Sequence, residues 1–195
     1  MADKYLVGGA GLTEFYDVTY NSETSTYTVG ATPVFSLTEI METKADRQED
    51  GTIKLSYTQL EDTEALETFL TTYALPPADS TGTLAEKNLE NGAKRGGGSA
   101  TGKNVLAVSY GAANNETPKK RKMTFAFGSI ASTSGSWTQK YNESTDPTFD
   151  FVGMKNDKKA ITVPITAVND DYANLAAAFD IPLNKSYMIK YLPLV

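Results

Sequence analysis

Alternation of apolar and polar residues along the second half of this chain constrains its fold more than any other feature. The candidate strands are Val105 to Tyr110, Met123 to Phe127, Ser136 to Tyr141, Phe149 to Val152, Ile161 to Val168 and Tyr187 to Leu192. Successive side chains of a strand point to opposite faces, so a period of two indicates strands with one buried face. Short strands separated by polar turns are typical of β-sandwiches and barrels. We therefore expect a mainly β (α+β) fold.

The first half adds further strands and a hairpin. Strands are predicted around Phe15 to Val18, over Phe35 to Ile40 and over Thr52 to Thr58. The last of these has Ile53, Leu55 and Tyr57 on one face, which is typical of a strand covered on one side. The segment Lys44 to Gly51 is charged and ends in an Asp-Gly pair that favours a turn. We expect strands 35–40 and 52–58 to form a long hairpin with a solvated tip.

One flanking helix is predicted after this hairpin. Its apolar residues, Leu66, Phe69, Leu70 and Tyr73, recur at i, i+3, i+4 and i+7 and so share one face. Asp62 is the expected N-cap, Glu64 lies near the positive end of the helix dipole, and Pro76-Pro77 ends the helix.

A second, short helix is predicted between the last two strands. Asn169-Asp170-Asp171 can cap a segment whose apolar face consists of Tyr172, Leu175, Ala176 and Phe179. A helix cap accounts for these carboxylates more simply than a calcium site, because no EF-hand spacing follows. We therefore assign no metal ligand.

The segment Asp79 to Lys103 is long, polar and rich in glycine, and we expect it to be mobile in the monomer. Within it, Gly97 to Lys103 nearly matches the phosphate-binding P-loop. That motif requires a hydrophobic strand before it and a helix beginning at the lysine, and neither is predicted here. We therefore expect no nucleotide or other cofactor.

Composition excludes several functional classes. The 195 residues, enough for a single domain, include no His and no Cys, which removes the commonest general base, thiolate nucleophiles and most zinc ligands. The net charge of -6 disfavours ordinary nucleic-acid binding but is compatible with the wall of a channel through which DNA slides. No signal peptide or membrane-spanning run is evident, so we expect a soluble protein made in a cytoplasm.

One dense basic run, Lys119-Lys120-Arg121-Lys122, interrupts this acidic sequence. It is interpreted first as a solvated connection between the strands that end at Tyr110 and begin at Met123. The alternative is electrostatic docking on the helix of a neighbouring copy, whose acidic residues are Glu61, Asp62, Glu64 and Glu67.

The order of motifs in the second half resembles the later hairpin region of tail-tube (major tail) proteins of tailed bacteriophages. The resemblance rests on Met123 to Ile130, Gly135 to Glu143 and Pro147 to Phe151. It implies a β-sandwich flanked by a helix, assembled into hexameric rings that stack through terminal arms and long loops. It also implies a non-enzymatic virion protein, located in the phage tail and made in the host cytoplasm. Its partners would be other tail and neck proteins, with DNA passing through the lumen without specific binding.

On this interpretation the N-terminal arm (residues 1–12), the hairpin tip and the long loop are assembly elements that are disordered alone. The predicted interface residues are Tyr5, Leu6, Val7, Arg47, Glu49, Asp50, Lys94, Arg95, Lys103, Lys119, Lys120, Arg121 and Lys122. Other interpretations remain open, namely a capsid decoration, head-completion or tail-terminator protein, or a β-sandwich binding module. An enzyme with paired carboxylates is the least favoured, and its candidate pairs are Asp146 with Asp150 and Asp170 with Asp171.

Overall fold

The computed structural model describes residues 12–38, 40–59, 63–73, 78–79, 82–83, 103–113, 119–131, 147–163 and 179–193. The predicted arm, the strand Ser136 to Tyr141 and nearly all of the second helix lie outside these residues. The long loop is described only at its two ends. Within the described residues the chain has a mainly β fold with one helix, which confirms the predicted fold class.

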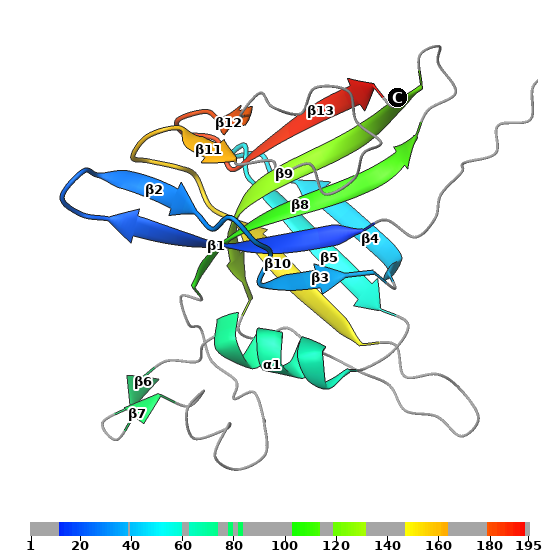
Figure 1. Ribbon diagram of the computed structural model, residues 1–195, viewed down its shortest axis with the longest axis horizontal. Helices are drawn as coiled ribbons and strands as arrows, with labels where there is room; N and C mark the ends of the chain where they lie inside the picture. Colours follow the sequence, from blue (N-terminus) through cyan, green and yellow to red (C-terminus); the bar gives the residue numbers. More distant parts are fainter. Residues whose placement is uncertain are drawn as a thin grey trace, which may run out of the picture.

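Nine strands form one antiparallel sheet (Figure 1). They are β1 (Thr13–Asn21), β2 (Thr26–Val29), β3 (Phe35–Leu37), β4 (Ile40–Arg47), β5 (Ile53–Gln59), β8 (Asn104–Ala113), β9 (Lys120–Ile130), β10 (Thr148–Gly153) and β13 (Tyr187–Pro193). The main order is β2-β1-β8-β9-β10-β5-β4, with β3 pairing to β1 and β13 pairing to β9. Two small antiparallel pairs are β6 (Ala78–Asp79) with β7 (Gly82–Thr83) and β11 (Ile161–Val163) with β12 (Phe179–Ile181).

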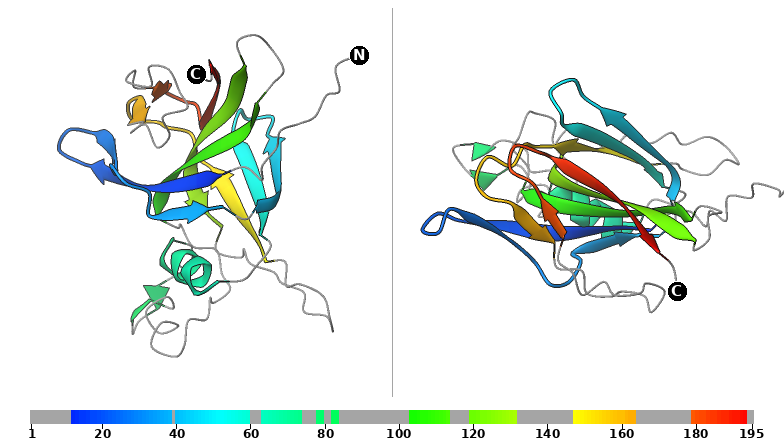
Figure 2. Two further views of the ribbon diagram at one scale, coloured as in Figure 1. Left: turned by 45° about the vertical axis from the view of Figure 1, so that its right-hand side comes forward. Right: turned by 90° about the horizontal axis from the view of Figure 1, so that it is seen from above.

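The sheet curls around an aromatic core. The ring of Phe15 on β1 lies 5.6 Å from that of Tyr57 on β5 and 6.0 Å from that of Phe149 on β10, although several strands separate them in the sheet. Such contacts require the two limbs of the sheet to face each other, as the views in Figure 2 show. The helix α1 (Glu64–Tyr73) closes the lower end of this half-open barrel.

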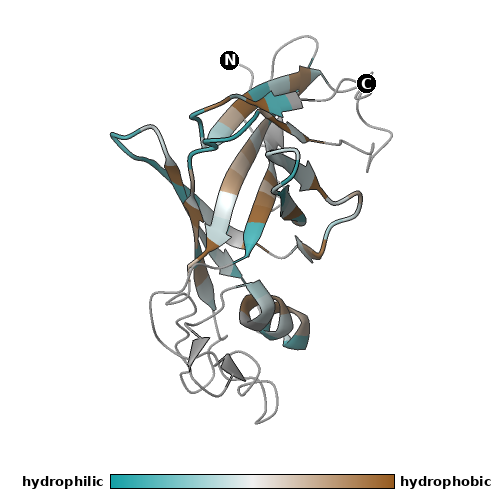
Figure 3. Ribbon diagram, turned by 90° about the vertical axis from the view of Figure 1, so that its left-hand side faces the viewer, coloured by the Kyte–Doolittle hydropathy of each residue, from teal (hydrophilic) through white to brown (hydrophobic). Residues whose placement is uncertain are grey.

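The opposite face of β1, β8 and β9 carries a second apolar cluster. It includes Tyr16, Leu106, Phe125 and Phe127, and residues of β11, β12 and β13 cover it. Both faces of these central strands are therefore buried, as the brown segments inside the sheet in Figure 3 illustrate.

The sheet divides at β9 because two strands share one edge of it. β13 pairs with residues 120–126 of β9, whereas β10 pairs with residues 128–130. Gly128 lies at this division, and a Cβ there would stand 2.1 Å from the carbonyl oxygen of Val152. Only glycine permits the backbone of β10 to approach β9 so closely.

The helix forms as its periodicity predicted. Leu66, Phe69, Leu70 and Tyr73 are all buried against the aromatic core. The N-cap, however, is Thr63 and not Asp62, because the backbone N–H of Leu66 donates to Thr63 Oγ1 at 3.1 Å.

Two predicted boundaries were wrong, and a third is tested only in part. The strand Phe35 to Ile40 is two strands, because β3 pairs with β1 and β4 begins only at Ile40, so that Lys44 to Arg47 belong to the hairpin's first strand and not to its tip. The strand predicted for Ile161 to Val168 is confirmed over Ile161–Val163, and residues 164–168 lie outside the described residues. Phe179 pairs with Val163 in β12, so it does not belong to a helix.

Candidate assembly surfaces

The outer strand of the sheet, β4, leaves apolar and polar positions uncovered. Among the described residues β4 pairs with β5 alone. Ala45 lies opposite Leu55 and therefore shares its face, yet Leu55 is buried and Ala45 is exposed. Thr43 and Arg47, on the same face, are also exposed. The core face of the sheet thus extends onto β4 beyond the part that the described residues cover.

The β4–β5 hairpin tip contains two predicted interface residues, Glu49 and Asp50, and a third, Arg47, is the last residue of β4; all three are exposed. The tip is a closed turn, which corrects the expectation that it is disordered. The backbone N–H and Oγ1 of Thr52 both donate to Asp50 Oδ1, at 2.9 and 2.7 Å, and Gly51 takes a positive φ of 85°. These two hydrogen bonds from Thr52 are the main cause that lowers the pKa of Asp50, with Lys155 Nζ, 3.7 Å from Oδ2, adding to it.

Asp150, one of the carboxylates considered for catalysis, has a structural role. Lys54 Nζ lies 2.8 Å from its Oδ2, and Ser56 Oγ donates to its Oδ1 at 2.5 Å. Burial acts to raise the pKa of Asp150, but the bonds from Lys54 and Ser56 outweigh it and the pKa is lowered. The group is therefore an ionised sheet-surface carboxylate at neutral pH, whereas a general acid needs a raised pKa.

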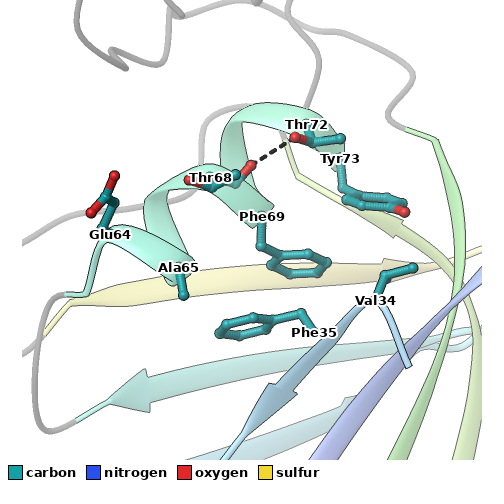
Figure 4. Close-up of a pocket in the computed structure, with 8 residues that line it drawn as sticks. All are labelled: Val34, Phe35, Glu64, Ala65, Thr68, Phe69, Thr72 and Tyr73. Atoms are coloured by element: carbon teal, nitrogen blue, oxygen red, sulfur yellow. Dashed lines mark hydrogen bonds between the residues drawn. The ribbon is translucent and has the colours of Figure 1, made fainter. Parts of the chain in front are cut away.

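A hollow of about 580 Å³ lies between α1 and the start of β3 (Figure 4). Its lining residues are Val34, Phe35, Glu64, Ala65, Thr68, Phe69, Thr72 and Tyr73. The rings of Phe35 and Phe69 stack with centroids 4.7 Å apart, and Val34 is 43% exposed at the edge. The hollow is apolar inside and carries the exposed carboxylate of Glu64 on its rim. We call it the α1 hollow.

The predicted interface residue Lys103 belongs to the same end of the molecule. Its backbone N–H donates to the carbonyl oxygen of Tyr73 at 3.1 Å, and its Nζ lies 5.6 Å from the centre of the Tyr73 ring. Burial raises the pKa of Tyr73, and the nearby Asp17 carboxylate raises it further. Glu64, Glu67 and Asp17 therefore give the α1 end three carboxylates.

The opposite end of the sheet is basic. Lys120, Arg121 and Lys122 begin β9 itself, which corrects their interpretation as a connection, and Lys119 precedes it. Register places Tyr191 of β13 opposite Lys122, and Lys190 opposite Met123. Tyr191 is 57% exposed, the largest exposed fraction among the large hydrophobic side chains described. We call Lys119, Lys120, Arg121, Lys122 and Lys190 the basic end.

One carboxylate is buried in the second core. Glu14 is 3% exposed, and its Oε2 accepts hydrogen bonds from Tyr16 at 2.7 Å and from Tyr110 at 2.9 Å. Burial, and then the bond to Glu14, raise the pKa of Tyr16. Because Tyr110 on β8 donates to Glu14 on β1, the carboxylate links these two paired strands.

The structure does not gather the predicted interface residues into one site. Arg47 lies at the end of β4 and Glu49 and Asp50 at the hairpin tip. Lys103 lies at the α1 end, and Lys119, Lys120, Arg121 and Lys122 lie at the basic end. Tyr5, Leu6, Val7, Lys94 and Arg95 lie outside the described residues. Figures 1, 2 and 3 all place α1 and the C-terminal end of β13 at opposite ends of the molecule.

Sequence reasoning missed Tyr191, Lys190 and the α1 hollow. Tyr187 to Leu192 is apolar at most positions, so alternation does not tell which of its residues face solvent. Val34 gave no signal, because an isolated apolar residue after a proline is ordinary in loops. Only the fold brings Val34 to the side of α1.

Comparison with protein-family models, with curated proteins and with solved structures finds no match for this chain. In the described part of the chain, no cluster of three or more His, Cys, Asp or Glu residues is arranged to hold a metal ion. None of the helices described there is both long and apolar enough to cross a membrane.

Proposed function

We propose that this chain is a structural subunit that assembles with copies of itself, as a phage tail-tube protein does. Its copies form hexameric rings, and stacked rings form a conduit for DNA ejection within the phage tail, in contact with other tail and neck proteins. The chain acts without catalytic residues or a cofactor, and DNA passes along its acidic wall without specific binding.

The observation that carries the proposal is the bare β4 strand. Among the described residues β4 pairs with β5 alone, so the backbone N–H and C=O groups of its alternate residues point outward at an edge of the sheet, and its core face at Thr43 and Ala45 is exposed. A free edge is a template for pairing with another chain. The sheet also has an edge at its other end, where β2 and β3 pair with β1. Pairing β4 of one copy with that edge of the next continues the sheet, and ring closure leaves no free edge.

Charge on β4 limits this pairing to the intended partner. Glu42, Lys44, Asp46 and Arg47 alternate in sign along the strand. Charged side chains on an edge prevent indiscriminate pairing, while two signs in fixed order select one register. The edge is thus suited to specific assembly and resists aggregation.

Electron microscopy of the purified chain at several concentrations tests the proposal. Rings or hollow tubes of uniform bore are expected for the natural sequence. Ala45→Lys places a charge on the exposed core face of β4 and is expected to leave only small particles, whereas the matched Ala160→Lys, at an exposed position outside the sheet, assembles normally. Small compact particles at every concentration of the natural sequence refute the proposal.

A second candidate function is that of a binding module, which the α1 hollow favours. Its volume of about 580 Å³ falls in the range of small-molecule and peptide sites, roughly 300–1,000 Å³, and its interior is aromatic. A chain that stays monodisperse at high concentration, and whose stability rises when a ligand is added, would place this function ahead of assembly.

A further inference from the structure

The basic end and the α1 end are complementary in charge. No Asp or Glu occurs in residues 119–131 or 187–193, which hold all five basic side chains of the basic end. The α1 end presents Glu64, which is exposed, and Glu67 and Asp17, which are partly exposed, against one base among the described residues, Lys103. Since the chain carries 18 basic and 24 acidic residues, gathering five bases at one end leaves the rest of the molecule strongly acidic.

The two ends are also complementary in shape. At the basic end the ring of Tyr191, 57% exposed, stands beside Lys122 on the same face of the sheet. At the α1 end the hollow is lined by Phe35, Phe69 and Ala65, and by Glu64, whose carboxylate points away from the two rings at the start of α1. An aromatic side chain flanked by a cation matches an apolar hollow flanked by an anion.

These two surfaces cannot meet within one molecule, because they lie at its opposite ends (Figures 1 and 3). We infer that the basic end of one copy docks on the α1 end of a second copy, with Tyr191 entering the α1 hollow and Lys119 and Lys122 facing Glu64. Each copy carries both surfaces, so the contact is heterologous and continues from copy to copy along one axis. The inference rests on the proposed self-assembly and assigns the surfaces through which the rings stack.

A second copy suits the basic end better than a nucleic acid does. Single-stranded nucleic acids are bound by Lys and Arg at the phosphates and by exposed aromatic rings that stack on the bases, and the basic end offers both kinds of side chain. The whole chain, however, has a net charge of -6 and repels a polyanion as it approaches. The α1 hollow and its neighbouring carboxylates, by contrast, are present on every copy and so at the same concentration as the basic end.

Sedimentation at low and high salt tests the contact in the Ala45→Lys background, where lateral pairing through β4 is blocked. Head-to-tail association is expected at low salt and weakens as salt screens the charges. Tyr191→Ser is expected to weaken association at least tenfold, whereas Leu183→Ser, which removes another exposed apolar side chain, leaves it unchanged. The double variant Lys119→Glu/Lys122→Glu has the same effect as Tyr191→Ser, while its matched control Lys159→Glu/Lys185→Glu associates normally.

A charge exchange identifies the partner surface. Lys122→Glu and Glu64→Lys are each expected to weaken association of the separate chains. An equimolar mixture of these two variants restores it, because both contacts that alternate along the mixed array then pair opposite charges. Circular dichroism and thermal melting confirm that each variant remains folded.

Three results overturn the inference: association that Tyr191→Ser does not change, a mixture that associates no better than its components, and absence of association at low salt. Binding of duplex DNA at the basic end is the remaining outcome. If Lys119→Glu/Lys122→Glu abolishes binding of a labelled duplex and leaves self-association intact, the basic end is a nucleic-acid site. If the Tyr191→Ser variant forms rings but its head-to-tail association is unchanged, the proposed function stands and only this contact is refuted. If association depends on Tyr191 but the natural sequence forms no rings, the contact stands and the proposed function is refuted.

Discussion

Replacing Gly128 by alanine tests the division of the sheet at β9. The added Cβ would lie 2.1 Å from the carbonyl oxygen of Val152 and 2.8 Å from Cζ of Phe151, more than an ångström inside ordinary contact with the carbonyl. Neither group moves freely. Phe151 and Val152 pair with Ile130 and Ser129 of β9, so relief of the clash requires that β10 separate from β9.

The expected loss is about 3 kcal/mol, at the upper end of the range for overpacked interiors. For a domain of this size that corresponds to a fall in Tm of roughly 6–12 °C. Urea unfolding followed by circular dichroism measures it, provided the transition is two-state. The sign of the change in unfolding free energy is informative, because alanine in an unobstructed strand stabilises the protein by about 0.5–1 kcal/mol relative to glycine.

Gly30→Ala is the matched control. Its Cβ would approach no atom closer than 3.6 Å, so its stability is expected to stay within about 0.5 kcal/mol of the natural sequence. A Gly128→Ala protein as stable as the Gly30→Ala protein would show that β10 does not approach β9 at this point. Equal losses in both variants would show that the clash at Gly128 is not the cause of the loss.

Three further predictions concern stability. Phe69→Ala removes the ring that contacts Phe15 and Phe35 and is expected to cost about 3–5 kcal/mol in urea unfolding, while Thr68→Ala, exposed on the same helix, changes little. Thr63→Ala removes the N-cap acceptor and should lower the free energy of unfolding by about 1 kcal/mol, and an unchanged value would contradict the assigned cap. Tyr16→Phe removes a bond to buried Glu14 and should cost about 2 kcal/mol at pH 8. Because folding raises the Tyr16 pKa, its contribution is complete below the unfolded pKa of about 10 and is lost as pH rises further, so denaturant midpoints of the variant should fall less steeply above pH 10 than those of the natural sequence.

Local patterns were sufficient for most single elements. Ile53, Leu55 and Tyr57 alternate over a strand that the structure describes as Ile53–Gln59, and the helix face of Leu66 to Tyr73 is buried as predicted. Such patterns reflect which face of a single helix or strand is buried, and the spacing of apolar residues over a few neighbouring positions is enough to identify that face. Asp62 was the wrong N-cap because Thr63 is the residue directly before the first helical residue, Glu64. Asp and Thr are both favoured N-caps, so the residue types alone do not decide between them.

Pairing between distant segments was not available from local patterns. The break between β3 and β4 follows from the partners of these strands, since β3 pairs with β1 and β4 with β5, and no residue between Phe35 and Ile40 marks it. The lengthening of β9 into its basic residues likewise depends on β8 and β13 lying on either side.

The sequence by itself determined a mainly β fold, the helix face from Leu66 to Tyr73, a basic run in an acidic molecule, and the lack of His and Cys. Only the tertiary structure decided that Ala45 stays exposed on the core face of β4. It also decided that Tyr191 projects beside Lys122, and that this basic end lies opposite a hollow with Glu64 on its rim. Alternation specifies which residues share a face, but whether another element covers that face depends on how the sheet curls and where the helix packs, and both are set by contacts between residues far apart in sequence.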